Sequence, residues 1–343
     1  MTEKSYPLEI RDAPPELVAE IRKYSNGAPM DYIQVGPQKY IFPSGFRNEC
    51  MKLYNMELRP DDVFVATFPK SGTTWTQELV WLIGNNFDYE TAAKIFLKER
   101  FPFIELPMML SDPKVVQWAR DQVKGDSAVT EAVMKMFSVP MMEVVAKLPS
   151  PRFIKTHLPF SMLPPSLLDT VKVVYVARDP RDVAVSYYHH SKLFKLKNFQ
   201  GDFPAFWQIF LKDGFDWCPY FAHVKEAWAK RGHPNLLFLF YEELYKDLPA
   251  AVRRVAKFLQ KPVSEEQVSK LCDHLHIDNF RKNKSVNSEE MQEIGFANKT
   301  ENFIRKGKAG GWRAYFDYDM TLQAERWMQE NLRDTDLRFP TKD

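Results

Sequence analysis

Lys155 and His157, two residues apart, form the pair of side chains that most directly indicates catalysis. They lie in the run Phe153–Leu158, whose apolar and β-branched residues predict a buried strand. Because side chains alternate along a strand, Lys155 and His157 project from the same face. A neutral histidine can remove a hydroxyl proton near neutral pH, and an adjacent ammonium ion favours the neutral ring. The alternative is a histidine that only completes the hydrogen bonds at the end of a strand.

The segment Thr67–Trp75 has the composition of a loop that binds phosphate between a strand and a helix. Gly72 permits a tight turn, and Lys70 supplies a positive charge. Main-chain amides at the helix start can surround the anion together with the hydroxyl groups of Ser71, Thr73 and Thr74. The usual nucleotide-binding loop has glycine directly before lysine, whereas here Lys70 precedes Gly72, which disfavours an ordinary ATPase. A small polar loop without a ligand is the alternative.

A second strand-to-helix junction follows the apolar run Val171–Ala177. Asp179 suits the N-cap of the next helix, the proline after it suits the first helical position, and Asp182 suits the third. Arg178 then lies at the carboxyl end of the strand. Ser186 lies about two turns into the helix. Arginine and hydroxyl together could hold a phosphate at this junction.

A basic, glycine-rich segment occurs at Phe303–Trp312, far along the chain from the first loop. Its cations and its glycines, which let the backbone approach a ligand closely, suit a second phosphate contact through Arg305, Lys306 and Gly307. The alternative is a solvated loop. Arg181, which lies in the strand-to-helix junction after Val171–Ala177, is interpreted as a solvated charge on the surface of a helix.

The apolar pattern along the chain predicts the strands and helices around these motifs. Short apolar runs predict interior strands at Val63–Thr67, Phe153–Leu158, Val171–Ala177 and Leu236–Phe240. Helices are predicted at Thr73–Gly84, Asp182–Leu193, Ala222–Arg231, Leu248–Leu259 and Thr321–Leu332. This alternation predicts an α/β fold, a single domain with a central, mainly parallel sheet flanked by helices. Ligands in such folds bind at the carboxyl ends of the strands, where the motifs lie.

Length and composition allow a large core and disfavour several classes of partner. The 343 residues are 45% hydrophobic and 27% charged and contain no repeat, so one domain over residues 1–343 is expected. The formal net charge of +2 argues against nucleic acid or an anionic membrane as a partner. The apolar runs fall far short of the roughly 20 residues that cross a bilayer. The start of the chain lacks the pattern of a secretory signal.

Cysteine and histidine spacing favours neither a disulfide framework nor a metal site. The three cysteines, Cys50, Cys218 and Cys272, are widely separated, which favours a reducing, cytoplasmic compartment. The pairs His189–His190 and His274–His276 lack further ligands at the spacing that zinc requires. No metal is therefore expected.

Taken together, the four motifs resemble the cytosolic sulfotransferase family over about residues 45–335. The resemblance implies a P-loop-like 5′-phosphosulfate loop at Lys70–Trp75, a catalytic strand at Lys155–His157, and 3′-phosphate contacts at Arg178, Ser186 and Arg305–Gly307. It also implies that Tyr241 contacts the adenine end of the donor. The donor would be 3′-phosphoadenosine 5′-phosphosulfate (PAPS) and the product adenosine 3′,5′-bisphosphate (PAP).

Within the family, the chain looks most like the insect-type enzymes, which include retinol dehydratase. The long spacing from Lys70 to Lys155 implies an insertion within about residues 92–142, over the acceptor pocket. Two segments depart from the family pattern. Leu275–Ile277 replaces residues that contact adenine in many relatives, and Arg313–Tyr318 replaces the family's dimer motif, so monomer and homodimer both stay open.

Residue chemistry and resemblance lead to one mechanism, in-line transfer of a sulfuryl group to an acceptor hydroxyl. His157 would act as general base, Lys70 would neutralise the leaving oxygen, Lys155 would steady the sulfuryl group, and Ser186 would bind the 3′-phosphate. The expected acceptor is a small hydrophobic alcohol or phenol. Aromatic and methionine-rich segments that could form its pocket are Phe101–Ile104, Met134–Phe137, Met141–Met142 and Phe203–Trp207, although such segments more often form ordinary core.

Two other functions fit parts of the sequence pattern. A nucleotide-dependent kinase could use Lys70 on ATP and Asp179 on magnesium, but the Asp179-Pro pair suits a helix start and the loop lacks the upstream glycine. A non-catalytic binder of hydrophobic ligands or nucleotide would not need both Lys155 and His157. An activity assay with PAPS separates these alternatives.

Overall fold

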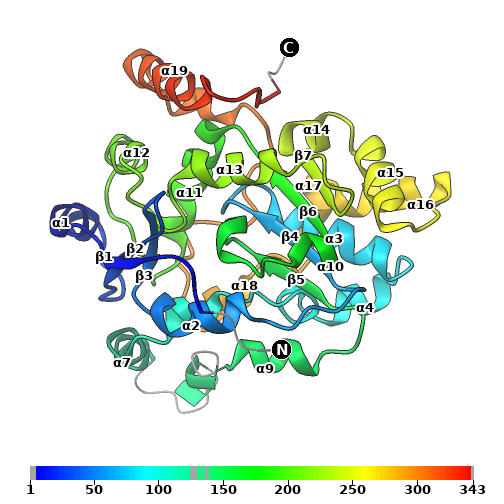
Figure 1. Ribbon diagram of the computed structural model, residues 1–343, viewed down its shortest axis with the longest axis horizontal. Coiled ribbons are helices and arrows are strands. Elements are labelled where there is room, and N and C mark those ends of the chain that lie inside the picture. The colour runs from blue at the N-terminus through cyan, green and yellow to red at the C-terminus, as the bar shows by residue number, and fades with distance from the viewer. Residues whose placement is uncertain (1–4, 124–129, 132, 136–138, 341–343) are drawn as a thin grey trace.

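Strand β4 (Val63–Thr67) lies inside the sheet that carries the motifs. It pairs in parallel with β5 (Phe153–Thr156) and β6 (Lys172–Ala177), and β6 pairs in parallel with β7 (Leu236–Phe240). Figure 1 draws the computed structural model, with these strands side by side in the order β5-β4-β6-β7. The structure describes residues 5–123, 130–131, 133–135 and 139–340. The predicted α/β fold with a parallel central sheet is confirmed.

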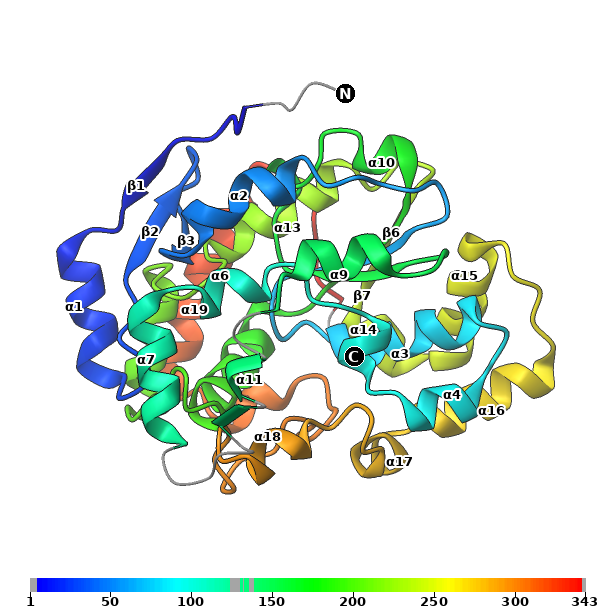
Figure 2. The same cartoon turned by 90° about the horizontal axis from the view of Figure 1, so that it is seen from below.

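Separate apolar clusters cover the two faces of this sheet, because side chains alternate along each strand. Val63 and Val65 pack into one cluster, whereas Phe64 and Ala66 pack into the other. The helices of the first cluster are α3 (Thr73–Gly84), α15 (Leu248–Leu259) and α16 (Glu265–Leu275). Those of the second are α11 (Pro180–Leu193), α12 (Phe203–Leu211), α13 (Tyr220–Ala229) and α19 (Tyr318–Leu332). Figure 2 shows these two groups of helices on opposite sides of the molecule.

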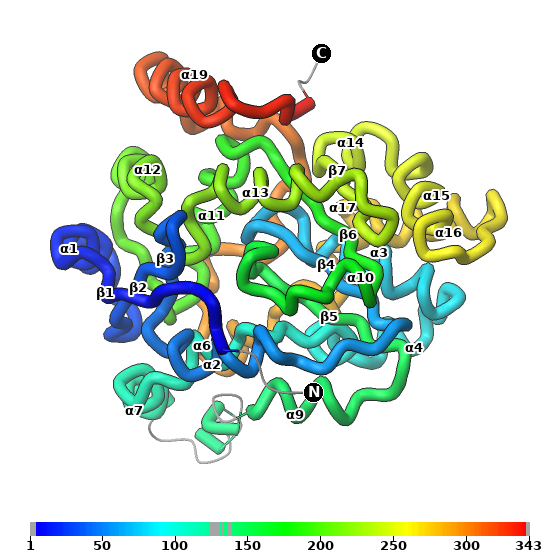
Figure 3. The backbone as a smooth tube through the Cα atoms, viewed as in Figure 1, coloured from blue at the N-terminus to red at the C-terminus, as the bar shows by residue number. Residues whose placement is uncertain are grey.

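The second cluster also includes a small antiparallel sheet that the sequence patterns did not predict. Its order is β1-β2-β3, and its strands are β1 (Ile10–Asp12), β2 (Tyr32–Val35) and β3 (Tyr40–Pro43). Main-chain hydrogen bonds join Ile41 of β3 to Trp217 and Cys218 in the loop before α13. Figure 3 shows β1, β2 and β3 close together, drawn in blue at the left of the view. The sheet therefore supports the loop that carries Trp217.

Shorter helices complete the described chain. They are α1 (Pro15–Tyr24), α2 (Phe46–Tyr54), α4 (Tyr89–Lys94), α5 (Leu97–Arg100), α6 (Leu106–Leu110), α7 (Pro113–Gln122), α9 (Met141–Lys147), α10 (Leu167–Thr170), α14 (Tyr241–Lys246), α17 (Ile277–Lys282) and α18 (Glu289–Glu293). Two 3₁₀ turns lie at Phe160–Met162 and Gly311–Ala314. Within the described part of the chain, none of the helices combines the length and the apolar character that crossing a membrane requires.

Most predicted boundaries agree with the structure, and the differences have local causes. The strand predicted to reach Leu158 ends at Thr156, because the amide of His157 bonds to a side chain instead of continuing the ladder. The last helix begins at Tyr318, three residues earlier than predicted, because Asp317 caps it by accepting from the Met320 amide at 2.8 Å. The helix predicted at 222–231 is α13, which begins directly after Pro219.

Candidate active site

His157 lies directly after β5 and is buried, with 7% of its surface exposed. Its Nδ1 atom is 2.8 Å from the carbonyl oxygen of Thr67, at the end of the neighbouring β4. Because a carbonyl oxygen only accepts hydrogen bonds, this contact requires the proton on Nδ1 and leaves Nε2 as the basic nitrogen. Burial, and then the charge of Lys155, lower the pKa of His157 well below its usual value. The ring is therefore neutral near pH 7.

A buried hydrogen-bond chain supports the main chain of His157 from α13. His223 Nε2 is 2.8 Å from the carbonyl oxygen of His157, and His223 Nδ1 is 2.8 Å from the hydroxyl of Tyr175. The carbonyl requires a donor at Nε2, so the Tyr175 hydroxyl donates to Nδ1. Burial lowers the pKa of His223 to about 4, which keeps the ring neutral. The sequence analysis missed His223, because it lies in a helix without a local motif.

Lys155 and His157 line the same cavity, as strand alternation predicted. The ammonium of Lys155 lies 4.3 Å from the centre of the Phe103 ring. Burial lowers the pKa of Lys155 to about 8, and the nearby Glu105 opposes this shift. A base and a cation therefore stand together at the carboxyl end of β5.

Lys70 contributes a second cation from the loop after β4. Its backbone adopts the left-handed conformation, with φ of 69°, and its ammonium lies 4.8 Å from the centre of the Phe303 ring. Burial lowers the pKa of Lys70 to about 7, and the charges of Lys155, Arg178 and Arg305 lower it further in that order. Four cations thus face one site, which is the electrostatic pattern of a place for a polyanion.

Gly72 and two aromatic rings form the wall next to this loop. Gly72 has φ of 99°, and a Cβ atom there would lie 2.6 Å from the ring of Tyr241. The rings of Trp75 and Tyr241 have centres 5.7 Å apart. The indole of Trp75 donates to the carbonyl oxygen of Leu275 at 3.0 Å. Glycine is required here both by the backbone angle and by the close approach of the ring.

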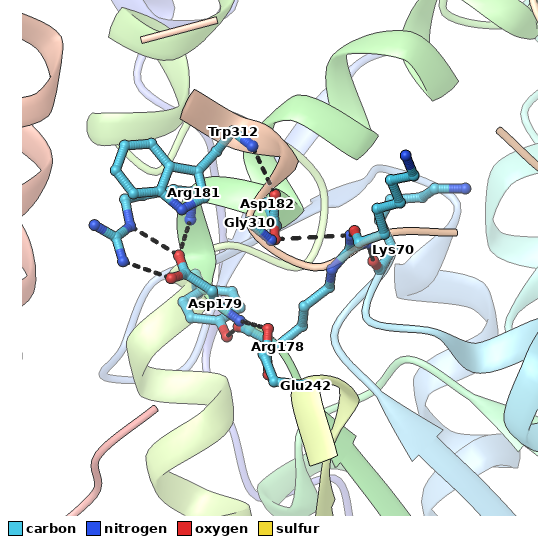
Figure 4. Close-up of polar contacts among 10 residues, drawn as sticks. Lys70, Arg178, Asp179, Arg181, Asp182, Glu242, Gly310 and Trp312 are labelled. Atoms are coloured by element: carbon cyan, nitrogen blue, oxygen red, sulfur yellow. Dashed lines mark hydrogen bonds and ion pairs between the residues drawn. The ribbon is translucent and has the colours of Figure 1, made fainter. Parts of the chain in front are cut away.

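Arg178 joins the two phosphate-type loops, as Figure 4 shows. Its Nη1 donates to the carbonyl oxygen of Lys70 and its Nη2 to that of Lys308, both at 3.1 Å. Its guanidinium also lies 4.2 Å from the centre of the Tyr241 ring. Segments that are more than 200 residues apart in sequence therefore meet at this arginine.

Asp182 lies at the third position of α11, as predicted, and its carboxylate also fastens the glycine-rich loop to that helix (Figure 4). Its carboxylate accepts from the amides of Gly310 at 2.6 Å and Trp312 at 2.9 Å. Asp179 is the N-cap, as predicted, and accepts from the Arg181 amide. The interpretation of Arg181 as a solvated charge is wrong. Its guanidinium pairs with Asp179 at 2.6 Å and stacks 3.9 Å from the Trp312 ring, because both partners lie within its reach.

The glycine-rich loop brings Arg305, Lys306 and Gly307 to the cavity that Ser186 also lines. Arg305 donates to the Tyr315 hydroxyl at 3.3 Å, and burial lowers its pKa. Gly307 has φ of 59° and lies so close to Ile277 that a Cβ atom would be 2.4 Å from that side chain. The loop is therefore packed at Gly307, whereas the neighbouring Lys306 and Lys308 are exposed.

One cavity of about 1060 Å³ connects these features. The predicted site residues that line it are Lys70, Gly72, Thr73, Thr74, Trp75, Lys155, His157, Arg178, Ser186, Tyr241, Arg305, Lys306 and Gly307. Ser71 lies behind this wall and is fully buried. Among the described residues, Ser71 Oγ and Arg178 Nε are buried without a hydrogen-bond partner. Unpaired polar atoms beside four cations fit an anionic ligand with several acceptor oxygens.

Apolar side chains form the part of the cavity beside His157. The wall includes Phe103, Leu106, Met109, Leu110, Leu196, Trp217, Met291, Phe296 and Phe303. Of the segments proposed for this pocket, Phe101–Ile104 contributes Phe103, whereas Phe203–Trp207 and Met141 belong to the core. Met136 and Phe137 lie outside the described residues. Sequence reasoning missed Trp217 and Phe296, which reach the wall through contacts that no local pattern encodes.

The histidine pairs have protein partners. His189 bonds to Glu301 at 2.8 Å and to the Tyr315 hydroxyl at 2.7 Å, and His274 bonds to Glu78 at 2.9 Å. Among the residues that the structure describes, no group of three or more His, Cys, Asp or Glu side chains is placed to hold a metal ion. Asp179, the magnesium ligand of the kinase alternative, is engaged by the helix start and by Arg181.

This combination of a parallel sheet, a strand-end histidine and two cationic loops belongs to a known family. The sequence model of the sulfotransferase domain matches residues 60–336, so the chain belongs to the sulfotransferase family. The predicted enzyme class is confirmed.

Solved structures and curated proteins agree with this assignment. Retinol dehydratase, solved with androsterone and the inactive cofactor PAP, superimposes with a TM-score of 0.93 and 46% identity, covering 98% of this chain and 99% of its own. A structure of retinol dehydratase with retinol and PAP has the same TM-score and identity. Luciferin sulfotransferase of Photinus pyralis is 32% identical over 312 residues, which cover 88% of this chain and 80% of that protein. The predicted similarity to retinol dehydratase is confirmed.

Proposed function

We propose that the enzyme transfers a sulfuryl group from PAPS to the hydroxyl of a small hydrophobic alcohol or phenol. The observation that carries this proposal is the cavity in which the basic Nε2 of His157 and the cations Lys70 and Lys155 share one wall. The donor supplies an activated sulfuryl group, and PAP, which is bound in the similar structures, is the product that remains. No metal is needed, because cationic side chains supply the positive charge.

The roles of the residues follow from their positions. His157 Nε2 takes the proton of the acceptor hydroxyl as the new oxygen–sulfur bond forms and the bond from sulfur to the phosphate oxygen breaks. Lys70 neutralises the charge that develops on that departing oxygen, and Lys155 steadies the sulfuryl group. Arg178 supports both loops, so that the attacking oxygen, the sulfur and the leaving oxygen lie in line.

The donor's two ends divide between the two loops. The hydroxyls of Thr73 and Thr74 and the main-chain amides of the loop Ser71–Trp75 surround the 5′-phosphosulfate. Ser186 and Arg305–Gly307 hold the 3′-phosphate. Tyr241, beside Trp75, contacts the adenine end. Leu275, His276 and Ile277 line the cavity, and the carbonyl oxygen of Leu275 accepts from the Trp75 indole.

The acceptor occupies the apolar part of the cavity. Part of this wall comes from Phe103, Leu106, Met109 and Leu110, which lie within the segment 92–142 that the spacing identified as an insertion. Retinol and androsterone, bound in the retinol dehydratase structures, are hydrophobic molecules of the class proposed here.

A single domain over 1–343 and a cytoplasmic location stay predictions. The predicted location is consistent with the three cysteines, which are free.

A direct assay tests the proposal. The protein is incubated with PAPS and a panel containing retinol, a hydroxysteroid and simple phenols, and mass spectrometry measures PAP together with the sulfated or dehydrated product. PAP formation that depends on a hydroxyl acceptor supports the proposal. PAP binding without turnover across the panel would favour the non-catalytic alternative, and phosphate transfer from ATP and magnesium would favour the kinase.

A further inference from the structure

Glu105 is a buried acid beside the catalytic strand that the mechanism above does not use. It lies just before α6, at the end of a short segment that runs along the free edge of β5. The Lys155 amide donates to the carbonyl oxygen of Pro102 at 2.9 Å, and the Ile104 amide donates to that of Lys155 at 3.2 Å. This pairing brings Phe103 against the Lys155 ammonium and Glu105 against the end of the strand.

Where β5 ends, the carboxylate of Glu105 accepts the main-chain hydrogen bond that a neighbouring strand would otherwise accept. Its Oε1 accepts from the main-chain amide of His157 and, at 2.9 Å, from the hydroxyl of Thr156. The same hydroxyl accepts from the Leu158 amide at 3.0 Å. Glu105 thus fixes three consecutive residues around the general base. On the other side, His223 holds the His157 carbonyl, so both main-chain polar groups of His157 are restrained.

Hydrogen bonding alone does not account for an acid at this position. Glu105 is fully buried, and its Oε2 has no hydrogen-bond partner among the described residues. A neutral amide could accept the same two bonds without the cost of burying a charge. Lys155 directly precedes the Thr156 hydroxyl that bonds to Glu105, and the charge of Glu105 raises the pKa of Lys155 against the effect of burial. A buried acid is therefore expected to act on Lys155 through its charge.

We propose that Glu105 is a positioning residue for the reaction, one that fixes the main chain of His157 and supplies the negative charge that faces Lys155. The inference rests on the proposed sulfuryl transfer. It also explains how the segment 92–142 can serve both the acceptor pocket and the chemistry: Leu106 and Met109 line the cavity directly after Glu105 holds the base.

The pH dependence separates the two roles. The titrating group whose charge acts on Glu105 is Lys155, and those that act on the His157 ring are Lys155, His223 from α13 and Lys70 from the loop after β4. Burial raises the pKa of Glu105 to about 7, so its negative charge develops as the pH rises through that value. Above it, the charge helps Lys155 to remain an ammonium. Below it, Glu105 and a glutamine at this position have the same charge.

The experiment compares Glu105→Gln, which keeps the acceptor oxygen, with Glu105→Ala, which removes it. We expect kcat of Glu105→Gln to match the parent enzyme below about pH 6.5 and to fall about tenfold above about pH 8, with its alkaline limb at lower pH. PAP affinity at neutral pH should stay within about twofold, because the phosphate loops are untouched. Glu49→Gln, at a buried glutamate of α2 outside the cavity, is the matched control. A Glu105→Gln profile that superimposes on the parent profile overturns the electrostatic role.

A readout without turnover tests the positioning role. In protein labelled with ¹⁵N-histidine, the resonance lost in His157→Ala identifies His157, and its nitrogen shifts report the tautomer. We expect Glu105→Gln to keep the Nδ1–H form and Glu105→Ala, if still folded by circular dichroism, to populate both forms. An unchanged His157 signal in folded Glu105→Ala overturns positioning. If Glu105→Ala does not fold, Glu105→Asp, whose shorter side chain withdraws the carboxylate from the His157 amide, takes its place under the same criterion. Absence of sulfuryl transfer in the parent enzyme would instead contradict the proposed function. The tautomer of His157 could still be measured, because that measurement needs no turnover.

Discussion

Donor binding should weaken as the pH rises, because a central cation of the empty site is only partly charged near neutrality. Burial and neighbouring cations lower the pKa of Lys70 to about 7. A bound phosphate favours the ammonium form and raises that pKa. Binding therefore takes up a proton at pH values between the pKa of Lys70 in the empty site and its raised pKa in the occupied site. The sign follows directly: affinity is fully present while Lys70 is charged, and it is lost as the pH rises through about 7.

The size of the effect follows from the fraction of Lys70 that is charged before binding. That fraction falls from about one half at pH 7 to about one hundredth at pH 9, which weakens PAP binding about 50-fold, or about 2 kcal/mol. The phosphates of PAP contribute little in this range, since their second pKa lies near 6. Lys155, whose pKa is lowered to about 8, adds a smaller decline if its charge reaches the 5′-phosphate.

Isothermal titration calorimetry with PAP measures both the affinity and the proton uptake, provided that buffers of different ionisation enthalpy are compared. Lys70→Arg keeps its charge throughout this range, so its pH dependence should be nearly flat. The same exchange at Lys114, an exposed residue paired with Asp31, should leave the parent slope unchanged. A parent affinity that stays within about twofold from pH 7 to pH 9 would refute the reasoning, as would an equal slope in Lys70→Arg.

Three further outcomes are expected. His157→Ala should lose about 10²–10⁴-fold in kcat and keep PAP affinity, as rapid-mixing kinetics and calorimetry can show; unchanged turnover removes the assignment of the base. Gly72→Ala should weaken PAP binding at least about tenfold, because its Cβ would press on the Tyr241 ring at 2.6 Å, whereas Gly295→Ala, with similar backbone strain in open space, should retain it. Trp217→Leu should raise the acceptor KM about tenfold and leave the donor KM unchanged, since the ring lines the cavity 5.5 Å from the His157 ring; equal changes in both constants would contradict its place in the acceptor wall.

The sequence predicted the parts of the fold that are encoded locally. The bounds of Val63–Thr67 and Leu236–Phe240 agree with the structure, because buried parallel strands are short, continuous apolar runs. Thr73–Gly84 and Leu248–Leu259 agree as well. The convergence of the first three motifs could be predicted because parallel strands end at the same edge of a sheet, whereas the glycine-rich segment follows no strand and was placed there by the family resemblance.

The features that the sequence did not predict depend on contacts between residues that are distant along the chain. The N-terminal antiparallel sheet was missed because its strands have only three or four residues each. Part of its support is a distant one, the main-chain hydrogen bonds between β3 and the loop before α13. Glu105 contacts a residue 52 positions away, and Arg178 contacts one 130 positions away. Asp182 followed the local rule for a helix start, but the amides of a remote loop compete for its carboxylate. No local pattern contains such partners.

Because Arg178 grips main-chain oxygens of Lys70 and Lys308, the connection between the loops is independent of which side chains those two positions carry. The charge of each loop can thus be changed by substituting one side chain at a time, while the main-chain contacts of Arg178 keep the distance between the loops. For an engineer, this separates the shape of the nucleotide cleft from its electrostatic character. Donors with fewer or differently placed negative groups could be sought by exchanging the lysines alone, with the arginine left in place.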